Sequence, residues 1–215
     1  MGGRDRGQGG VGPVVPAAGS ESWPVVATAR LVLRPFEDMD RAPFHALNTH
    51  PLVVEALGWS PSRAESDAIV DHIGEEMARD GWGIWAVEAA GGTPFVGMVG
   101  LHRARAELPF APAVEVEWRL HPDHWGHGYA TEAAAASLQF GFDEAGLDEI
   151  VAYTTTLNGR SQAVMERIGM ERDRAGDFDH PRLPEGSPLR RHVLYRVTSE
   201  GRAVARSQSA PTVRP

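Results

Sequence analysis

Hydrophobic positions along the chain follow two periods, one typical of helices and one typical of strands. Several segments have helical apolar spacing or are rich in alanine, and predict helices: residues 38–48, 63–79, 128–144 and 161–168. Others alternate apolar and polar side chains or form short apolar runs, and predict strands: residues 31–33, 84–88, 95–101, 113–120, 150–155 and 192–197. Two early helices, a hairpin turning at residues 90–92, and then strand–helix–strand–helix–strand predict a mixed α/β fold.

The two ends of the chain lack this patterning. Residues 1–22 are rich in glycine with hardly any large apolar side chains, and residues 199–215 are small, polar and arginine-bearing. Neither end can bury enough apolar surface to offset the entropy of ordering it. We therefore expect disordered tails at 1–22 and 199–215 around one domain at 23–198.

The net charge and the lack of long apolar runs limit the kinds of partner that the chain can bind. The chain of 215 residues has a formal net charge of −8, which argues against nucleic acid as the main partner. No apolar run approaches the roughly 20 residues of a membrane span, and the N-terminus lacks the apolar core of a signal peptide. These features predict a cytoplasmic protein that binds neither nucleic acid nor membrane.

Two residue types are absent, and their absence narrows the chemistry. The sequence has no lysine, which excludes a Schiff-base enzyme and a phosphate loop of the Walker type. It has no cysteine, which excludes a thiol nucleophile, disulfides and cysteine-ligated metal sites. Any reactive sulfur must arrive on a bound molecule.

The segment at residues 114–132, VEVEWRLHPDHWGHGYATE, is the most informative. Gly126-His127-Gly128 leads into a helix, where free N–H groups and the helix dipole favour an anion such as a pyrophosphate. An ordinary glycine-rich turn is the plain alternative. A dinucleotide site of the Rossmann type is disfavoured, because seven residues separate Leu120 from Gly128 and the next strand ends in threonines without a carboxylate.

Motifs in this order resemble the GNAT superfamily of N-acetyltransferases. Residues 125–130, WGHGYA, look like its acetyl-CoA pyrophosphate loop, with Trp125 where Gln or Arg is usual; EVEWRL at 115–120 resembles its fourth strand. NGRS at 158–161 and MERIGM at 165–170 resemble its later motifs, and TARLVLR at 28–34 is similar to the branch that contains the ribosomal-protein (Rim-type) N-terminal acetyltransferases. The resemblance covers residues 28–197.

The resemblance implies a fold and a binding site for acetyl-CoA. The fold has a central mixed, mostly antiparallel sheet of six or seven strands, about four flanking helices, and splayed fourth and fifth strands that admit the pantetheine arm. Backbone groups would bind the arm, and the loop would bind the pyrophosphate, with no metal. The implied cofactor-binding residues are Trp118, Arg119, Leu120, Trp125, Gly126, His127, Gly128, Tyr129, Ala130, Asn158 and Ser161.

Acetyl transfer to an amine needs a base, an oxyanion donor and a proton for the leaving thiolate. Glu115 and Glu117 share one strand face, and either side chain can take the amine proton if burial raises its pKa; a solvated strand face is the alternative. Glu115 matches the family's strand-four acid. An N–H near Trp118 is the expected oxyanion donor. Ser161 is the expected proton donor, with helix capping as its alternative.

Other polar clusters are harder to assign. His121, His124 and His127 have a spacing that suggests metal ligands, but they lie in a turn without a fixed face, so we expect no metal. The acidic segment at 177–185 is expected to be an irregular loop that suits a cationic acceptor. Three tryptophans are candidates for an acceptor pocket or, more often, the core: Trp59, Trp82 and Trp85.

The sequence therefore predicts an N-acetyltransferase that moves an acetyl group from acetyl-CoA to a primary amine by direct attack in a ternary complex. The acceptor is a protein N-terminal α-amine or a small-molecule amine, and the protein a monomer or homodimer. The alternative is a non-catalytic module that binds and senses acyl-CoA.

Overall fold

The computed structural model describes residues 23–201. The predicted tail at 1–22, and residues 202–215 of the predicted tail at 199–215, lie outside the described residues. Residues 199–201 form a helical turn after the last strand, and the Ser199 N–H donates to the Asp148 carbonyl at 3.0 Å. No helix in this described range is long and apolar enough to cross a bilayer.

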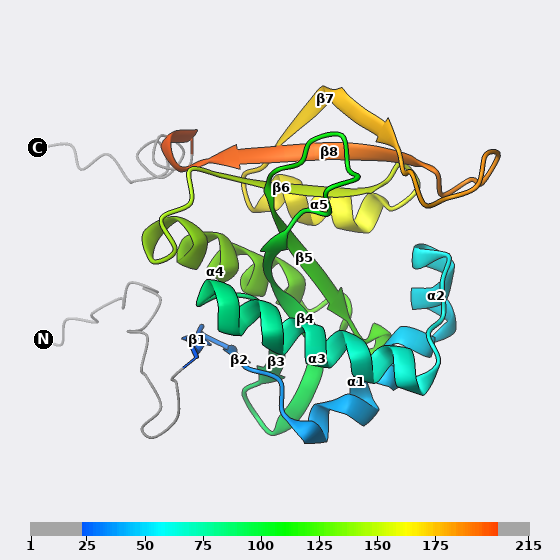
Figure 1. The fold of residues 1–215 in the computed structure, drawn as a ribbon. Helices are drawn as coiled ribbons and strands as arrows, with labels where there is room; N and C mark the ends of the chain where they lie inside the picture. Colours follow the sequence, from blue (N-terminus) through cyan, green and yellow to red (C-terminus); the bar gives the residue numbers. More distant parts are fainter. Residues whose placement is uncertain (1–22, 202–215) are drawn as a thin grey trace, which may run out of the picture.

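Eight strands form one sheet in the order β1-β2-β3-β4-β5-β6-β8-β7 (Figure 1). The strands are β1 (Val26–Ala27), β2 (Leu31–Arg34), β3 (Ile84–Ala89), β4 (Thr93–Arg103), β5 (Val114–Leu120), β6 (Glu149–Thr155), β7 (Glu171–Asp179) and β8 (Arg191–Thr198). The helices are α1 (Arg41–Thr49), α2 (Pro51–Leu57), α3 (Arg63–Asp80), α4 (Tyr129–Asp143) and α5 (Gly159–Arg167), with short 3₁₀ turns η1 (Asp38–Asp40) and η2 (Pro122–His124). The mixed α/β prediction is confirmed, with one strand more than the upper end of the expected range.

The sheet consists of two antiparallel halves that meet along one short parallel seam. Strands β1 to β5 pair antiparallel, as do β6, β8 and β7, whereas β5 and β6 are joined at the single residue pair Glu115 and Val151. Beyond that pair β5 runs diagonally away from β6 (Figure 1). The predicted splay of the fourth and fifth strands of the family pattern is therefore confirmed, and they are β5 and β6 here.

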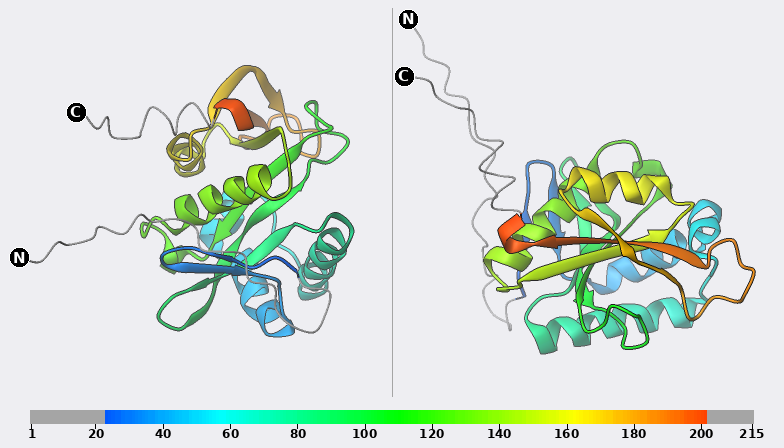
Figure 2. Two further views of the ribbon diagram at one scale, coloured as in Figure 1. Left: turned by 90° about the vertical axis from the view of Figure 1, so that its left-hand side faces the viewer. Right: turned by 90° about the horizontal axis from the view of Figure 1, so that it is seen from above.

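Both faces of the sheet are covered, so polar side chains on either face can be buried. Helix α4 packs on β4 and β5, and α5 on β6; Trp85, Val99 and Val116 belong to this larger core. On the opposite face a second core gathers Phe44, Ile73 and other residues of α1–α3 against β3 and β4. Figure 2 shows α4 and α5 on one side of the sheet and α3 on the other.

Local signals explain where the longest helix begins and ends. The Ser62 hydroxyl accepts from the Glu65 N–H while the Glu65 carboxylate accepts from the Ser62 N–H, a capping box that starts α3. Gly81 ends the helix with φ of 74°, a conformation that favours glycine.

Helix α2 was not predicted, although its signals are present. The ring of His50 accepts from the Leu52 N–H at 3.2 Å, Pro51 occupies the first turn, and Gly58 follows with φ of 67°. This is the usual arrangement of proline near the start and glycine after the end of a helix. The segment is too short for its apolar period to be distinctive.

Strand β7 corrects the prediction that residues 177–185 form one irregular loop. Asp177, Phe178 and Asp179 belong to β7, and the connection to β8 runs from 180 to 190. The strand has no apolar alternation because it lies at the sheet edge, where ion pairs replace a buried face. Arg196 of β8 pairs with Asp173 at 2.9 Å.

Candidate functional site

The gap between β5 and β6 leaves backbone groups of Trp118 without a strand partner. The His121 N–H donates to the Val96 carbonyl at 2.9 Å, and hydrogen-bonded pairs alternate along an antiparallel ladder. Opposite Met98, Arg119 therefore points its N–H and C=O toward β4, whereas Trp118, opposite Val99, points its own toward the gap. This arrangement fits the predicted role of Trp118 and turns the backbone groups of Arg119 away from the gap.

At the open end of the gap, a glycine loop presents free N–H groups at the start of α4. The first hydrogen bond of this helix runs from the Glu132 N–H to the Gly128 carbonyl at 3.0 Å. The N–H groups of residues 126–131 have no hydrogen-bond partner within the described residues. Gly126 and Gly128 have φ of 81° and 79°, which other residues rarely adopt. Such a cradle suits a pyrophosphate.

Arg30, in the turn between β1 and β2, braces this loop from outside. Its Nη1 donates to the His127 carbonyl at 2.9 Å, and its Nε donates to Glu132 at 2.7 Å. Its guanidinium lies 5.0 Å from the centroid of the Tyr129 ring, and Glu132 also accepts from the Thr28 hydroxyl at 2.6 Å. The loop is therefore fixed to the sheet by an ion pair between distant segments.

Trp125 packs under the loop instead of offering a polar side chain there. Its ring contacts both cores, and its Nε1 donates to the Leu120 carbonyl at 2.8 Å. The guanidinium of Arg160, from α5, lies 4.6 Å from the centroid of the indole. This contact links the loop to the β6 side of the gap and leaves a cation beside the cradle.

Asn158 and Ser161 stand at the start of α5, after β6. The Asn158 Oδ1 accepts from the Ser161 N–H at 3.1 Å, so Asn158 is the helix cap. The capping alternative for Ser161 is therefore wrong. The Ser161 hydroxyl has no hydrogen-bond partner among the described residues and is available as a donor.

Glu115 and Glu117 lie on one face of β5 together with Arg119, which bonds to Asn48 of α1, and both approach one histidine of β4. The Nε2 of His102 is 3.3 Å from a carboxylate oxygen of each residue. Glu115 is only 6% exposed, which contradicts a solvated strand face. It sits at the last point where β5 still pairs with β6.

The two carboxylates have different surroundings. Burial raises the pKa of Glu115, with His102 opposing and Glu117 adding to that rise. Burial acts in the same direction on Glu117, but His102 and Arg119 outweigh it and lower the pKa of Glu117 from 4.5 to about 2. Arg119 Nη2 donates to Glu117 at 2.8 Å, and its Nη1 donates to Asn48 of α1. Glu117 is thus a fixed anion, and Glu115 the group whose protonation can change.

Comparisons with known proteins match the same region of the chain. Residues 30–171 match the family model described as acetyltransferase (GNAT) domain. The chain belongs to the GNAT acetyltransferase family. It is 32% identical, over 84% of its length and 78% of the relative, to the FsC-acetyl coenzyme A-N(2)-transacetylase of Aspergillus fumigatus.

Solved GNAT structures share the fold. A GNAT acetyltransferase from Bacillus anthracis is 27% identical with a TM-score of 0.67, covering 82% of this chain and 99% of that one. Vibrio cholerae spermidine N-acetyltransferase, in complex with CoA and spermine, is 18% identical, TM-score 0.65, covering 82% and 99%. RimL, a ribosomal L7/L12 α-N-protein acetyltransferase in complex with CoA, is 16% identical, TM-score 0.66, covering 81% and 97%. The Rim branch is therefore no closer in fold than other GNAT groups.

In this acetyltransferase, rings from three strands and one loop gather beside the two glutamates. Tyr153 of β6 lies 5.5 Å from Phe178 and 5.6 Å from His192, measured between ring centroids. His180 lies 5.1 Å from His192, and burial lowers the pKa of both histidines. Burial, then the charges of Glu115 and Glu117, raise the pKa of Tyr153, so this wall of the GNAT site is neutral.

The acidic residues expected to attract a cationic acceptor are mostly paired within the fold. Asp177 accepts from Arg172 at 2.6 Å, and Asp179 from Arg191 at 3.3 Å. The β7–β8 connection itself is pinned to the β4–β5 loop by Arg182 and Glu107 at 2.6 Å. The buried acid at the start of the gap is instead Glu115, whose ion-pair partner is His102 of β4.

The three tryptophans separate into core and surface. Trp85 is fully buried, and its Nε1 donates to the Pro24 carbonyl at 2.8 Å; Trp82 is 8% exposed. Both belong to the core. Trp59 is 42% exposed on the turn after α2.

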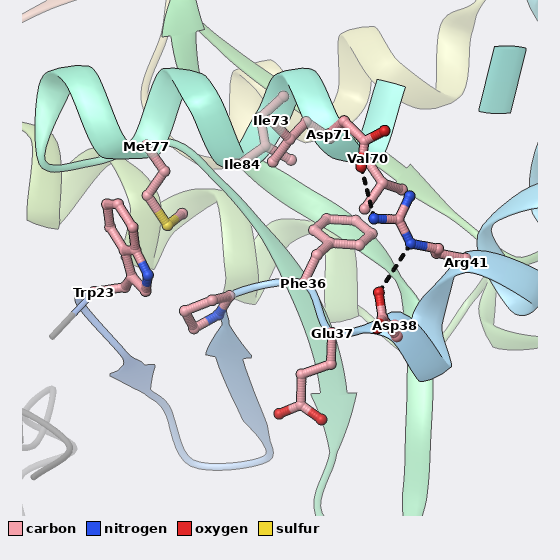
Figure 3. Close-up of a pocket in the computed structure, with 12 residues that line it drawn as sticks. Trp23, Phe36, Glu37, Asp38, Arg41, Val70, Asp71, Ile73, Met77 and Ile84 are labelled. Carbon is pink, nitrogen blue, oxygen red and sulfur yellow. Dashed lines mark hydrogen bonds and ion pairs between the residues drawn. The ribbon is translucent and has the colours of Figure 1, made fainter. Parts of the chain in front are cut away.

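A pocket of about 250 Å³ lies elsewhere, between α3 and the segment after β2 (Figure 3). Figure 3 shows Arg41 bridging Asp38 and Asp71 at one end and Trp23 beside Met77 at the other. None of the predicted site residues lines it. We therefore assign no part of acetyl transfer to it. Among the described residues, no group of three or more acidic or histidine side chains is arranged to hold a metal ion.

His102 and Tyr153 are the site residues that the sequence did not reveal. His102 faces Glu115 because β4 pairs with β5 in a register that places the two residues opposite each other. Because the loop at residues 104–113 separates the two strands, the hydrophobic pattern of the sequence does not predict that register. The sequence pattern identified Tyr153 only as one residue of a predicted strand, with no sign of a role in the site.

Proposed function

We propose that this GNAT enzyme transfers an acetyl group from acetyl-CoA to a primary amine by direct attack in a ternary complex. The observation that carries the proposal is the position of buried Glu115 where β5 parts from β6, next to the free backbone groups of Trp118. An acid with a raised pKa at such a point suits proton abstraction near neutral pH. Acetyl-CoA supplies an activated thioester carbonyl when bound.

Each residue of the site has a role in this proposal. The N–H groups of residues 126–131 bind the pyrophosphate, and Arg160 adds a positive charge. Trp118 and Asn158 hold the pantetheine arm, and the Trp118 N–H donates to the carbonyl oxygen as it gains negative charge. Glu115 takes the amine proton, and Ser161 donates a proton to the departing thiolate.

The acceptor is a protein N-terminal α-amine or a small-molecule amine. The relatives support an amine: one is named for transfer to N(2) of FsC, another for spermidine and a third for an α-amine of ribosomal protein L7/L12. The neutral ring wall, and the pairing of Glu117 with Arg119, favour an acceptor with one amine over a polyamine. We also propose that the protein is cytoplasmic and is a monomer or a homodimer.

A thiol-release assay tests the function. Purified protein with acetyl-CoA is offered a panel of amines, including peptides with N-terminal Ala or Ser, monoamines and spermidine. The proposal predicts thiol release only when an accepted amine is added, with initial velocities that depend on both substrates in the pattern of a ternary complex.

The alternative of an acyl-CoA-sensing module predicts tight CoA binding with no amine-dependent release. A sensing role gains support if calorimetry shows CoA binding while every amine in the panel stays unacetylated by mass spectrometry. Parallel-line kinetics would instead contradict direct transfer.

A further inference from the structure

His102, a titratable group beside the proposed base, has no part in the proposed reaction. Its side chain is 15% exposed, and its Nε2 lies 3.3 Å from Glu115 Oε2 and 3.3 Å from Glu117 Oε2. Its Nδ1 lies 3.1 Å from the carbonyl oxygen of Arg103. The imidazole thus lies at equal distances from the carboxylates of Glu115 and Glu117.

The contacts of the ring show which of its two nitrogens can gain or lose a proton. A carbonyl oxygen only accepts, so Nδ1 carries a hydrogen and donates to Arg103. A neutral ring would then turn the lone pair of Nε2 toward two carboxylate oxygens, an unfavourable contact inside the protein. A protonated ring places an N–H between them. The arrangement therefore favours the imidazolium.

A single N–H cannot be aligned with both carboxylates. Neither His102 Nε2 nor Glu115 Oε2 has a well-aligned hydrogen-bond partner among the described residues, although both atoms are buried. Glu117 also pairs with Arg119, whereas the ion pair that Glu115 makes within residues 23–201 is with His102. The bridge therefore holds Glu115 by charge more than by a directed bond.

We propose that His102 is a positioning residue that, as an imidazolium, keeps Glu115 ionised and holds its carboxylate in place, and thereby sets the lower pH limit of acetyl transfer. This inference rests on the proposed function, in which Glu115 is the base. His102 itself does not touch the acceptor or acetyl-CoA in this account.

The direction in which the pKa of Glu115 changes when His102 is replaced depends on all the charged and titratable groups around Glu115. His102 of β4 and Arg105 of the β4–β5 loop favour its ionised form; Glu117 of β5 and burial oppose it, and Tyr153 of β6 is neutral. The pKa of Glu115 already lies above 4.5, with burial as the largest cause. Removing the charge of His102 leaves the opposing effects dominant, so the pKa of Glu115 rises further.

The first test is the pH profile of His102→Gln, which keeps a polar side chain but loses the charge. We expect the acid limb of kcat/KM for the amine to move up by about one pH unit or more, so that the variant is roughly tenfold slower below the limb and approaches wild type above it. Because the same amine is used in both, its own ionisation cancels. The matched control is His72→Gln, an exposed histidine of α3 beside Glu75 and Glu76, whose profile should equal wild type.

A second substitution distinguishes the loss of the His102 charge from the loss of its side-chain shape. In the double variant His102→Gln with Glu117→Gln, a cation and an anion are removed together. The acid limb should return toward that of wild type, even if the maximum rate is lower. A limb that stays displaced in the double variant, or a loss in His102→Gln that is equal at all pH values, overturns the proposal.

A measurement on the unchanged protein covers the case in which His102→Gln does not fold. Nitrogen NMR of the histidine rings reports protonation directly. Burial lowers the pKa of His102, but Glu115 and Glu117 outweigh burial and raise that pKa well above its usual value. We expect an imidazolium signal that persists above pH 7; a neutral ring at that pH overturns the inference. If the wild-type protein releases no thiol with any amine, that result contradicts the proposed function and not the role of His102 alone.

Discussion

At the scale of single residues, two glutamates two positions apart have opposite properties. Glu117 is flanked by His102 and Arg119, whose hydrogen bonds and charge outweigh burial and lower its pKa to about 2. Glu115 is more deeply buried and has a raised pKa. When surroundings push the pKa values of neighbouring acids apart, their roles separate. The sequence placed both on one face but did not reveal which is the base, since that depends on His102 and Arg119.

Glu117→Gln tests the anionic role through stability. The folded protein holds the pKa of Glu117 at about 2 against 4.5 when unfolded, so this residue stabilises the fold above pH 4.5 and the effect is lost as the pH falls from 4.5 toward 2. We expect the variant to be less stable by about 1–3 kcal/mol at pH 7 and to lose less stability than wild type on acidification. Chemical denaturation at several pH values measures both; equal slopes for the two proteins would refute the assignment.

At the scale of elements, the turn between β1 and β2 positions the start of α4. The glycine loop and the helix were readable from sequence, because glycine and alanine spacing signals them directly. The brace by Arg30 was not readable, because Arg30 and Glu132 lie far apart in sequence and meet only through the sheet order. Strand β7 was missed for a related reason: an edge strand with ion pairs has no apolar period.

Arg30→Ala tests the brace. Losing its bond to the His127 carbonyl should loosen the loop and weaken CoA binding roughly three- to tenfold, with little effect on the amine KM. Arg63→Ala is the matched control, because Arg63 has a similar exposure, 52% against 50%, and an ion pair with Asp67 on α3. Calorimetry with CoA measures the difference; equal affinities in the two variants would remove Arg30 from the binding account.

At the scale of the whole molecule, two antiparallel half-sheets meet at one residue pair, and the proposed CoA site fills the opening beyond it. The order of elements predicted a mixed α/β fold, and the resemblance to the family implied the splayed strands. Neither revealed the surroundings of the glutamate face, which come from His102 of β4 and, through Arg119, from Asn48 of α1. A ligand that spans both halves should stabilise them together. At about 100 times its Kd, CoA should add roughly 2.7 kcal/mol, seen as a rise in Tm that NAD does not produce. Stabilisation by NAD alone would favour a dinucleotide site.

The most direct test of the account compares Glu115→Gln with wild type in amine-dependent thiol release from pH 6 to pH 10. If Glu115 takes the amine proton, the variant should be at least about 100-fold slower near neutral pH. The deficit should shrink as the pH rises and more of the amine is already deprotonated. A variant as fast as wild type near neutral pH, or a deficit that is the same at every pH, would contradict the assignment of Glu115 as the base.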